Sequence, residues 1–280
     1  MTNRPPRWLT AFTALVYLVL FAPILVLIVF SFNDSPRAFI WRGFTLDWYP
    51  TLFGDDDLLD ALGVTLQVAA IAVVGSTILG SLLGLGLARL KFRGSGFVQT
   101  LLLLPMITPE VIMGISLLVF FFQLFGSTGS IGQISLAHIT FCISYVAITV
   151  RARAANLNPQ LEEAARDLGA SALGAFRHVT VPLLAPAIAS GAMLAFALSF
   201  DDLVITSFNA GVGSTTLPVA IWSSLRFGVT PEINAISTIV VAVVALILLF
   251  AWRLGAFRNA AQAAVIAEPD TAEGRATARP

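Results

Sequence analysis

Six long apolar runs constrain the fold of this chain more than any other feature. The first, from Leu9 to Phe32, contains no charged residue. Because about 20 predominantly apolar residues cross a bilayer as a helix, each run is a candidate transmembrane span. The predicted spans lie near residues 9–32, 62–88, 97–125, 134–150, 183–207 and 233–252. The sequence therefore predicts an all-α membrane protein with six transmembrane helices.

The predicted transmembrane domain covers residues 9–255 and leaves two short terminal segments. Residues 1–8 form the N-terminal segment. The first apolar run is much longer than the core of about 7–15 residues in a secretory signal peptide, so we expect it to remain as an uncleaved span. The tail, residues 256–280, is Ala-rich and polar without an apolar face, and we expect it to be disordered.

Composition excludes an ordinary soluble domain and offers no metal site. Hydrophobic residues make up 57% of the chain and charged residues 11%, against about 25% charge in soluble domains. Cys142 is the single cysteine and lies in a predicted span, so neither a disulfide nor a Cys-based metal site is predicted. His138 and His178 are too separated to form a metal site and are interpreted as hydrogen-bonding structural residues.

The basic residues predict the orientation of the chain. With the N-terminus in the cytoplasm, thirteen of the sixteen Lys and Arg residues fall in cytoplasmic segments, and Arg37, Arg42 and Arg226 fall outside. This asymmetry follows the positive-inside rule, and an even number of spans places both termini in the cytoplasm. The outer face is acidic, which water-exposed loops explain; an electrostatic bias toward cations is the alternative.

The polar segment 151–182, between the fourth and fifth predicted spans, has a helical pattern. Leu161, Ala164, Ala165 and Leu168 recur at i, i+3, i+4 and i+7 and share one helix face. Gly169 then suits a left-handed turn. A second short helix is predicted next, with Ser171 as its cap and Leu173 and Phe176 on it, and Pro182 suits the first turn of the fifth span. An ordinary interfacial helix pair would show the same periodicity.

The spacing of this segment resembles the EAA loop of permeases of ATP-binding-cassette (ABC) importers. Glu163-Ala164-Ala165 is followed after three residues by Gly169 and after nine more by Val179-Thr180-Val181-Pro182, where the family has Ile, any residue, Leu and Pro. The resemblance implies a type I ABC importer permease fold and a coupling helix, at about 170–176, that docks in a cleft of a separate ATPase. The coupling residues that it implies are Glu163, Ala164, Ala165, Gly169, Ala170, Leu173, Phe176 and Pro182. Glu163 would pair with a basic residue of the ATPase or brace the loop internally.

A wider resemblance, over about residues 10–255, indicates the subfamily. The chain is similar to the C-type permeases of spermidine and putrescine importers, and to the putrescine version in particular. The segments that carry this similarity are Ser31-Phe32-Asn33, Trp41, Gly43-Phe44-Thr45-Leu46, Trp48-Tyr49, Ala137-His138, Thr140-Phe141-Cys142, Leu198-Ser199-Phe200-Asp201-Asp202, Thr215-Thr216-Leu217-Pro218, Gly228-Val229 and Pro231-Glu232-Ile233-Asn234-Ala235.

The same resemblance implies the partners and the location of the chain. It implies a heterodimer with a second permease, two ATPase subunits and a periplasmic or lipid-anchored binding protein, in the lipid of a bacterial cytoplasmic (inner) membrane. The sequence has no Gly-x4-Gly-Lys-Ser/Thr phosphate loop, so ATP and Mg are expected on the ATPase. We expect a transport subunit that is not itself an enzyme, has no cofactor of its own and has no nucleic-acid partner.

Three carboxylates within or beside apolar spans are candidates for a solute pathway: Glu110, Asp201 and Asp202. Such residues are costly in a bilayer, at about 2.5–3.5 kcal/mol for an Asp near its centre, and usually face a cavity, a partner or water. A diammonium solute would need such acceptors. The alternatives are loop hydrogen bonds for the two aspartates, and for Glu110 the satisfaction of backbone donors freed where Pro105 and Pro109 break the third span.

Three further features leave alternatives open. Trp222 is a candidate for a cation–π contact, although interfacial aromatic belts explain such residues without a ligand. Ser76, Gly80, Gly84 and Ala88 form a small-residue stripe that lets a helix of this chain or of another approach closely. The rival functions are an importer permease for thiamine, iron or an oxyanion, and an ion-gradient transporter, which generally shows internal repeats that this sequence lacks.

Overall fold

The computed structural model describes residues 6–35, 40–127, 129–226 and 231–253. The regular structure of these residues is helical, with two isolated β-bridges, Asn33–Phe44 and Gly129–Ala210. The predicted tail, 256–280, lies outside the described residues. The elements are α1 (Arg7–Phe30), α2 (Trp48–Phe53), α3 (Asp56–Arg89), α4 (Ser95–Ile107), α5 (Glu110–Phe125), α6 (Ile131–Ala155), α7 (Gln160–Asp167), α8 (Ala172–Ala175), the π-helical turn η1 (Phe176–Thr180), α9 (Val181–Phe200), α10 (Val204–Asn209), α11 (Leu217–Leu225) and α12 (Pro231–Arg253).

Four of the described helices are long and apolar enough to cross a membrane. They are Trp8–Phe30, Asp56–Arg89, Ile131–Ala155 and the continuous run Ala172–Phe200. The pair α4 and α5 is a fifth candidate that is bent by 110°, and α12 contributes a shorter apolar stretch, Pro231–Leu246. The expected break of the third span is thus confirmed; it lies at Pro109, whereas Pro105 lies inside α4.

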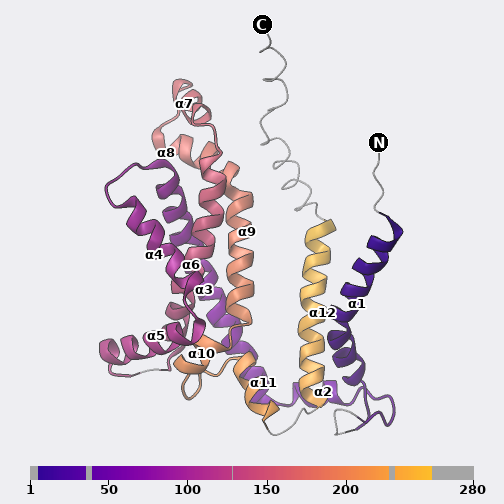
Figure 1. Ribbon diagram of the computed structural model, residues 1–280. Helices are drawn as coiled ribbons and strands as arrows, with labels where there is room; N and C mark the ends of the chain where they lie inside the picture. The colour runs from indigo at the N-terminus through magenta and orange to yellow at the C-terminus, as the bar shows by residue number, and fades with distance from the viewer. Residues whose placement is uncertain (1–5, 36–39, 128, 227–230, 254–280) are drawn as a thin grey trace. The chain divides into compact units, whose positions relative to one another are not determined.

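The chain divides into two compact units, which are described separately. The first contains residues 1–59 and 221–257. In it α12 packs against α1 and α2 (Figure 1). The loop between α1 and α2 is fixed by polar contacts: Trp48 Nε1 donates to the carbonyl of Asn33 at 2.8 Å, and the hydroxyls of Ser31 and Tyr49 are 2.9 Å apart.

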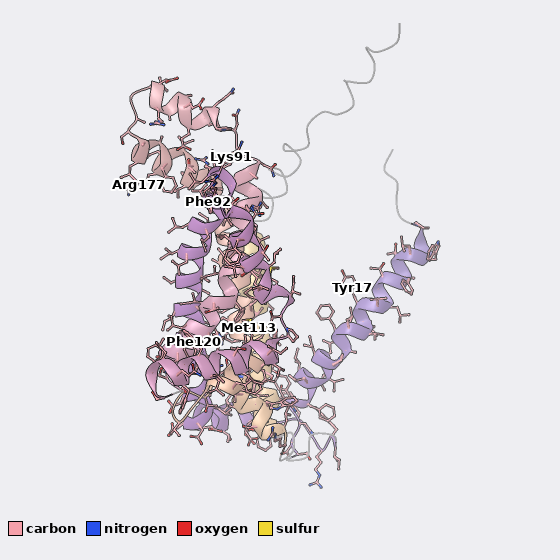
Figure 2. All side chains as sticks on the ribbon, turned by 60° about the vertical axis from the view of Figure 1, so that its left-hand side comes forward. Tyr17, Lys91, Phe92, Met113, Phe120 and Arg177 are labelled. Atoms are coloured by element: carbon pink, nitrogen blue, oxygen red, sulfur yellow. The ribbon has the colours of Figure 1, made fainter. Side chains whose placement is uncertain are left out.

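The second unit, residues 60–220, is built around α6. Helices α4, α9 and α10 pack against α6, and α10 packs against α5. Twelve residues of α6 are buried, among them Phe141, Val146 and Val150 in the main apolar cluster. Helices α7 and α8 lie at one end of α6 and α9, and α5 and α10 lie near the other (Figure 1). Lys91 and Arg177 lie at the same end as α7, away from Met113 and Phe120 on α5 (Figure 2).

The small-residue stripe of α3 packs within this chain. A Cβ atom added at Gly84 would lie 2.4 Å from the carbonyl oxygen of Ala147, and one added at Gly80 would lie 2.7 Å from Cβ of Val146. Both neighbours are on α6. Because only glycine lets two helix backbones come this close, the stripe sets the contact between α3 and α6.

The end of the fifth span differs from the sequence-based prediction. The fifth span was expected to reach residue 207, but α9 ends at Phe200 and the chain turns before α10. The start of α9 at Val181, with Pro182 in its first turn, is as predicted, although α8 and η1 run into α9 without a break. Proline has no N–H to donate four residues back, and the π-helical turn absorbs this loss: Val181 N–H bonds to the carbonyl of Phe176, five residues back.

Candidate functional site

A cavity of about 240 Å³ brings together the three carboxylates singled out in the sequence. It lies between the α4–α5 break, α6 and the α9–α10 turn. Its lining residues are Pro105, Glu110, Met113, Phe141, Tyr145, Leu198, Asp201, Asp202, Leu203, Val204 and Ile205. Glu110 lies more than ninety positions before the adjacent residues Asp201 and Asp202, so this meeting is a property of the tertiary structure.

Local backbone chemistry positions Glu110 at the cavity. Thr108 precedes a proline and is extended, with φ −70° and ψ 131°, which ends α4. Glu110 is then the first residue of α5, where a carboxylate is stabilised by the positive end of the helix dipole. Its side chain is exposed and has no hydrogen bond or ion pair within the described part of the chain. The alternative interpretation of Glu110, as an acceptor for backbone donors freed by the break, is therefore not what the structure shows.

Asp202 has a different environment because both of its carboxylate oxygens accept hydrogen bonds. Oδ2 accepts from the N–H of Thr206 at 2.8 Å and from its hydroxyl at 2.7 Å, and Oδ1 accepts from the N–H of Ile205 at 3.3 Å. These bonds cap the N-terminal end of α10. The structure therefore gives Asp202 the loop-bonded environment that the sequence left as an alternative. Asp201, next to it, is exposed and caps the C-terminal end of α9 through its backbone N–H.

His138, buried on α6, joins three helices behind the cavity. Its Nδ1 lies 2.7 Å from Oγ of Ser199, and its Nε2 lies 2.9 Å from Oγ1 of Thr206 and 3.3 Å from Oδ2 of Asp202. Because the Thr206 hydroxyl donates to Asp202, Nε2 of a neutral His138 donates to Thr206 and Nδ1 accepts from Ser199. The prediction of a structural, hydrogen-bonding role for His138 is confirmed.

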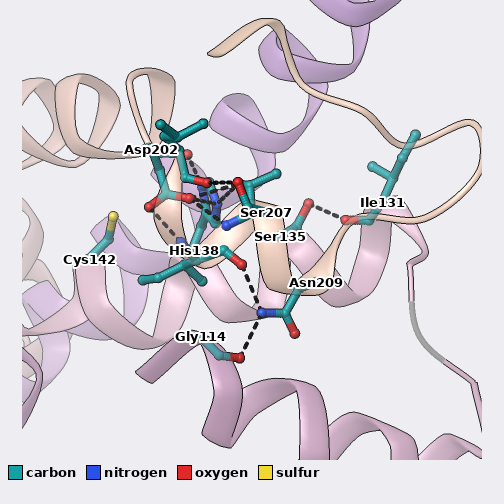
Figure 3. Close-up of polar contacts among 12 residues, drawn as sticks. Gly114, Ile131, Ser135, His138, Cys142, Asp202, Ser207 and Asn209 are labelled. Atoms are coloured by element: carbon teal, nitrogen blue, oxygen red, sulfur yellow. Dashed lines mark hydrogen bonds and ion pairs between the residues drawn. The ribbon is translucent and has the colours of Figure 1, made fainter. Parts of the chain in front are cut away.

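A second polar contact holds α5 against α10 near the same place. Nδ2 of Asn209 donates to the carbonyls of Gly114 on α5, at 3.1 Å, and of Ile205, at 2.9 Å (Figure 3). A Cβ atom at Gly114 would come within 2.7 Å of the Phe208 ring. The packing of α5 on α10 therefore depends on a glycine and an amide, which fixes one wall of the cavity.

The aromatic residues that line the cavity are Phe141 and Tyr145. Trp222 lies on α11 with 52% of its surface exposed and is not a lining residue. Tyr145 lines the cavity and was missed. Its position was readable in principle, because His138, Phe141, Cys142 and Tyr145 fall at i, i+3, i+4 and i+7 on one face of α6.

The second candidate site is the loop that contains α7 and α8. The turn predicted at Gly169 is present, and the φ of Gly169 is +92°. The N–H of Ala170 donates to the carbonyl of Ala165 at 3.1 Å, and the N–H of Gly169 donates to the carbonyl of Arg166 at 2.9 Å. This pair of bonds is a Schellman motif, which requires the left-handed residue that glycine supplies. The predicted cap is also present, since Ser171 Oγ accepts from the N–H of Gly174 at 3.1 Å.

The loop exposes apolar side chains that the described chain does not cover. Leu168 is 90% exposed and Leu173 is 74% exposed, on either side of the turn. Glu163 and Ala164 are exposed, as is Pro182 at the start of α9, whereas Ala165, Ala170 and Phe176 are half-buried. The carboxylate of Glu163 has no hydrogen bond or ion pair to the described residues. The loop therefore presents an exposed surface on which the carboxylate of Glu163 is free to bind another molecule.

Glu162, which the sequence reasoning passed over, makes the internal contacts of this loop. Its carboxylate pairs with Arg89, the last residue of α3, and accepts a hydrogen bond from the Thr180 hydroxyl at 3.0 Å. Partial burial acts to raise the pKa of Glu162, but the hydrogen bonds from Arg89 and Thr180 and the charges of Arg89 and Arg166 outweigh it and hold the pKa below the ordinary value of 4.5. Its partner Arg89 is 73 residues away, so no local pattern could reveal it.

Relatives of known type match most of the chain. It is 42% identical over 263 residues to the putrescine transport system permease protein PotI of Escherichia coli (strain K12), which covers 91% of this chain and 94% of that protein. It is 40% identical over 243 residues to the spermidine/putrescine transport system permease protein PotC of the same organism, covering 87% and 91%. The PotC protein of Haemophilus influenzae is 39% identical over 231 residues, covering 82% and 90%.

Solved structures share the fold. A bacterial ABC transporter that imports alginate superposes with a TM-score of 0.65 at 16% identity, over 89% of this chain and 96% of that chain. An amino acid ABC transporter superposes with a TM-score of 0.55 at 20% identity, over 76% and 99%. The model of the family described as binding-protein-dependent transport system inner membrane component matches residues 76–261. The chain is thus a multi-pass permease subunit and belongs to this family of inner membrane components.

Proposed function

We propose that this chain is one of two permease subunits of an ATP-driven polyamine importer, with putrescine as its main solute, in a bacterial cytoplasmic membrane. The proposal includes six spans with both termini in the cytoplasm, in line with the positive-inside distribution of Lys and Arg. The relatives named for putrescine and spermidine transport, at about 40% identity over most of the chain, support this solute class.

The cavity carries the solute assignment. Glu110 and Asp201 are exposed carboxylates at its wall, and the carboxylate of Asp202 adds negative charge behind them. A charged ammonium group entering a low-dielectric site needs such acceptors in place of water. Tyr145 and Phe141 supply aromatic surface beside the carboxylates, which suits an alkylammonium chain. An oxyanion would be repelled by the same wall.

The loop of α7 and α8 is the proposed docking element for a separate ATPase, which would bind ATP and Mg. Leu168 and Leu173 offer an exposed apolar surface of the kind that a partner covers, and the free carboxylate of Glu163 suits a basic residue of that partner. The proposed assembly contains a second permease, two ATPase subunits and an external binding protein. Exposed apolar residues along α1, such as Leu18, would face lipid or the second permease.

Uptake by proteoliposomes tests the solute assignment. The purified assembly, with its binding protein outside and ATP inside, is given radiolabelled putrescine, spermidine, thiamine, iron and sulfate in turn. We expect putrescine uptake by the parent, reduced about tenfold or more in Asp201→Asn and Glu110→Gln, because a lost charged hydrogen bond costs about 1.5–3 kcal/mol. Asp57→Asn is the control, since it removes the same charge from an exposed position on α3 that does not line the cavity.

Two results would contradict the proposal. Uptake of thiamine, iron or sulfate without uptake of a polyamine would show that the solute is wrong. Putrescine uptake by Asp201→Asn and Glu110→Gln at the rate of Asp57→Asn would remove the cavity from the pathway. Assembly of each variant is checked by co-purification with the ATPase, and full transport by this chain without an ATPase would overturn the importer assignment.

A further inference from the structure

A single carboxylate oxygen joins three elements at the end of the second unit where α7 lies. Oε2 of Glu162 on α7 pairs with Arg89 at the end of α3 and accepts from the Thr180 hydroxyl in η1. We call Glu162, Arg89 and Thr180 the Glu162 bracket. Thr180 is buried, whereas the side chains of Glu162 and Arg89 are 24% and 30% exposed.

The bracket differs from the neighbouring glutamate in what it contacts. Glu163 is exposed and has no side-chain partner among the described residues, whereas Glu162 has two partners on other elements. Adjacent residues of a helix diverge by about 100°, so one can face a partner protein while the other faces the body of its own chain. The two glutamates of α7 therefore have different surroundings.

The contact with Thr180 reaches the start of α9. Thr180 is the last residue of the π-helical turn, and Pro182 leaves the backbone after it without one helical hydrogen bond. Such turns lack the regular bonding that stiffens a helix, so the Glu162 contact supplies a constraint where the helix has lost one. On its other side the same carboxylate holds the end of α3.

We infer that Glu162 is a positioning residue that ties α7 to α3 and to α9, so that a displacement of α7 moves both transmembrane helices. This inference rests on the proposed function, because the displacement comes from an ATPase docked on the loop. In this arrangement Glu162 controls how much solute moves for each ATP that is hydrolysed. Docking itself depends on the exposed surface and does not require the bracket.

The test measures transport and ATP hydrolysis together in the full reconstituted transporter, with putrescine and its binding protein. The variants are Glu162→Gln, Arg89→Gln and the double variant, and Asp167→Asn is the matched control, since it removes one exposed charge from the same helix. We expect each single variant to keep ATP hydrolysis and to lower the ratio of putrescine imported to ATP hydrolysed at least about fivefold, the lower end of usual coupling effects. The double variant should be no worse than either single variant, because both remove the same contact.

Several outcomes would overturn the inference. A Glu162→Gln ratio equal to that of Asp167→Asn, or losses in the two single variants that multiply in the double variant, would show that the bracket does not carry the coupling. If Glu162→Gln does not assemble, Thr180→Val carries the test, because it is close in volume and removes the hydroxyl that donates to Glu162. A ratio of putrescine imported to ATP hydrolysed in Thr180→Val that equals the ratio of the parent would contradict the inference. Failure of the parent to bind an ATPase would instead contradict the proposed function.

Discussion

The contact between α3 and α6 predicts a strong difference between two glycines of one helix. Gly84→Ala places a Cβ atom 2.4 Å from the carbonyl oxygen of Ala147, whereas Gly86→Ala meets nothing within 4 Å. To reach an ordinary contact distance of 3.4 Å, the new carbon must move by about 1 Å, and the atom it meets is backbone. Helix α3 must therefore shift away from α6, which loosens the buried contacts that Val146 and its neighbours make.

Comparing the two variants with each other removes the contribution of intrinsic helix propensity. Both glycines lie inside α3, so alanine improves the intrinsic helix propensity by about 1 kcal/mol in each. The difference between the variants is then the cost of overpacking alone, about 1–3 kcal/mol. We expect Gly84→Ala to be less stable than Gly86→Ala by that amount, and Gly86→Ala to be at least as stable as the parent.

The assay is equilibrium unfolding of the purified chain in mixed micelles, with helicity followed as sodium dodecyl sulfate is increased. The free energy of unfolding is extrapolated for parent, Gly84→Ala and Gly86→Ala under identical conditions. Equal stability of the two variants would refute the close approach of α3 and α6. A loss in both would show that α3 is tightly packed on the Gly86 side as well.

Two further predictions concern the loop of α7 and α8. Gly169→Leu should abolish transport while the chain still enters the membrane, because a side chain at φ +92° costs about 1–3 kcal/mol and distorts the turn; normal uptake in the proteoliposome assay would contradict this, and Gly96→Ala, at an open helical position, is the control. The pKa of Glu162 is lower in the folded protein than its ordinary value of 4.5. The contacts of Glu162 with Arg89 and Thr180, near the charge of Arg166, therefore stabilise the loop fully above pH 4.5, and this stabilisation is lost as the pH falls through the pKa of the folded protein. Hydrogen–deuterium exchange of α7 from about pH 6 to about pH 3, corrected for intrinsic rates, should show protection lost in the parent and little change in Glu162→Gln; identical profiles would contradict the prediction.

Local sequence patterns were enough for the features that depend on a few neighbouring residues. The turn at Gly169 follows from the need for a left-handed residue after α7, and the α4–α5 break follows from Pro109, which keeps Thr108 before it extended. The long apolar helices follow from the cost of exposing polar backbone to lipid. Family membership was also predictable, because the spacing from Glu163 to Pro182 is a property of the chain alone.

Only the tertiary structure decided which distant groups meet. Glu110 and Asp201 come to one cavity because α5 packs on α10, and that packing depends on contacts between Gly114, Phe208 and Asn209. The small-residue stripe of α3 packs against α6 of the same chain. Local periodicity shows which residues share a helix face, but not which other helix packs against that face. For the same reason the sequence predicted the exposed Glu163 and passed over Glu162, whose contacts with Arg89 and Thr180 exist only after three elements have packed together.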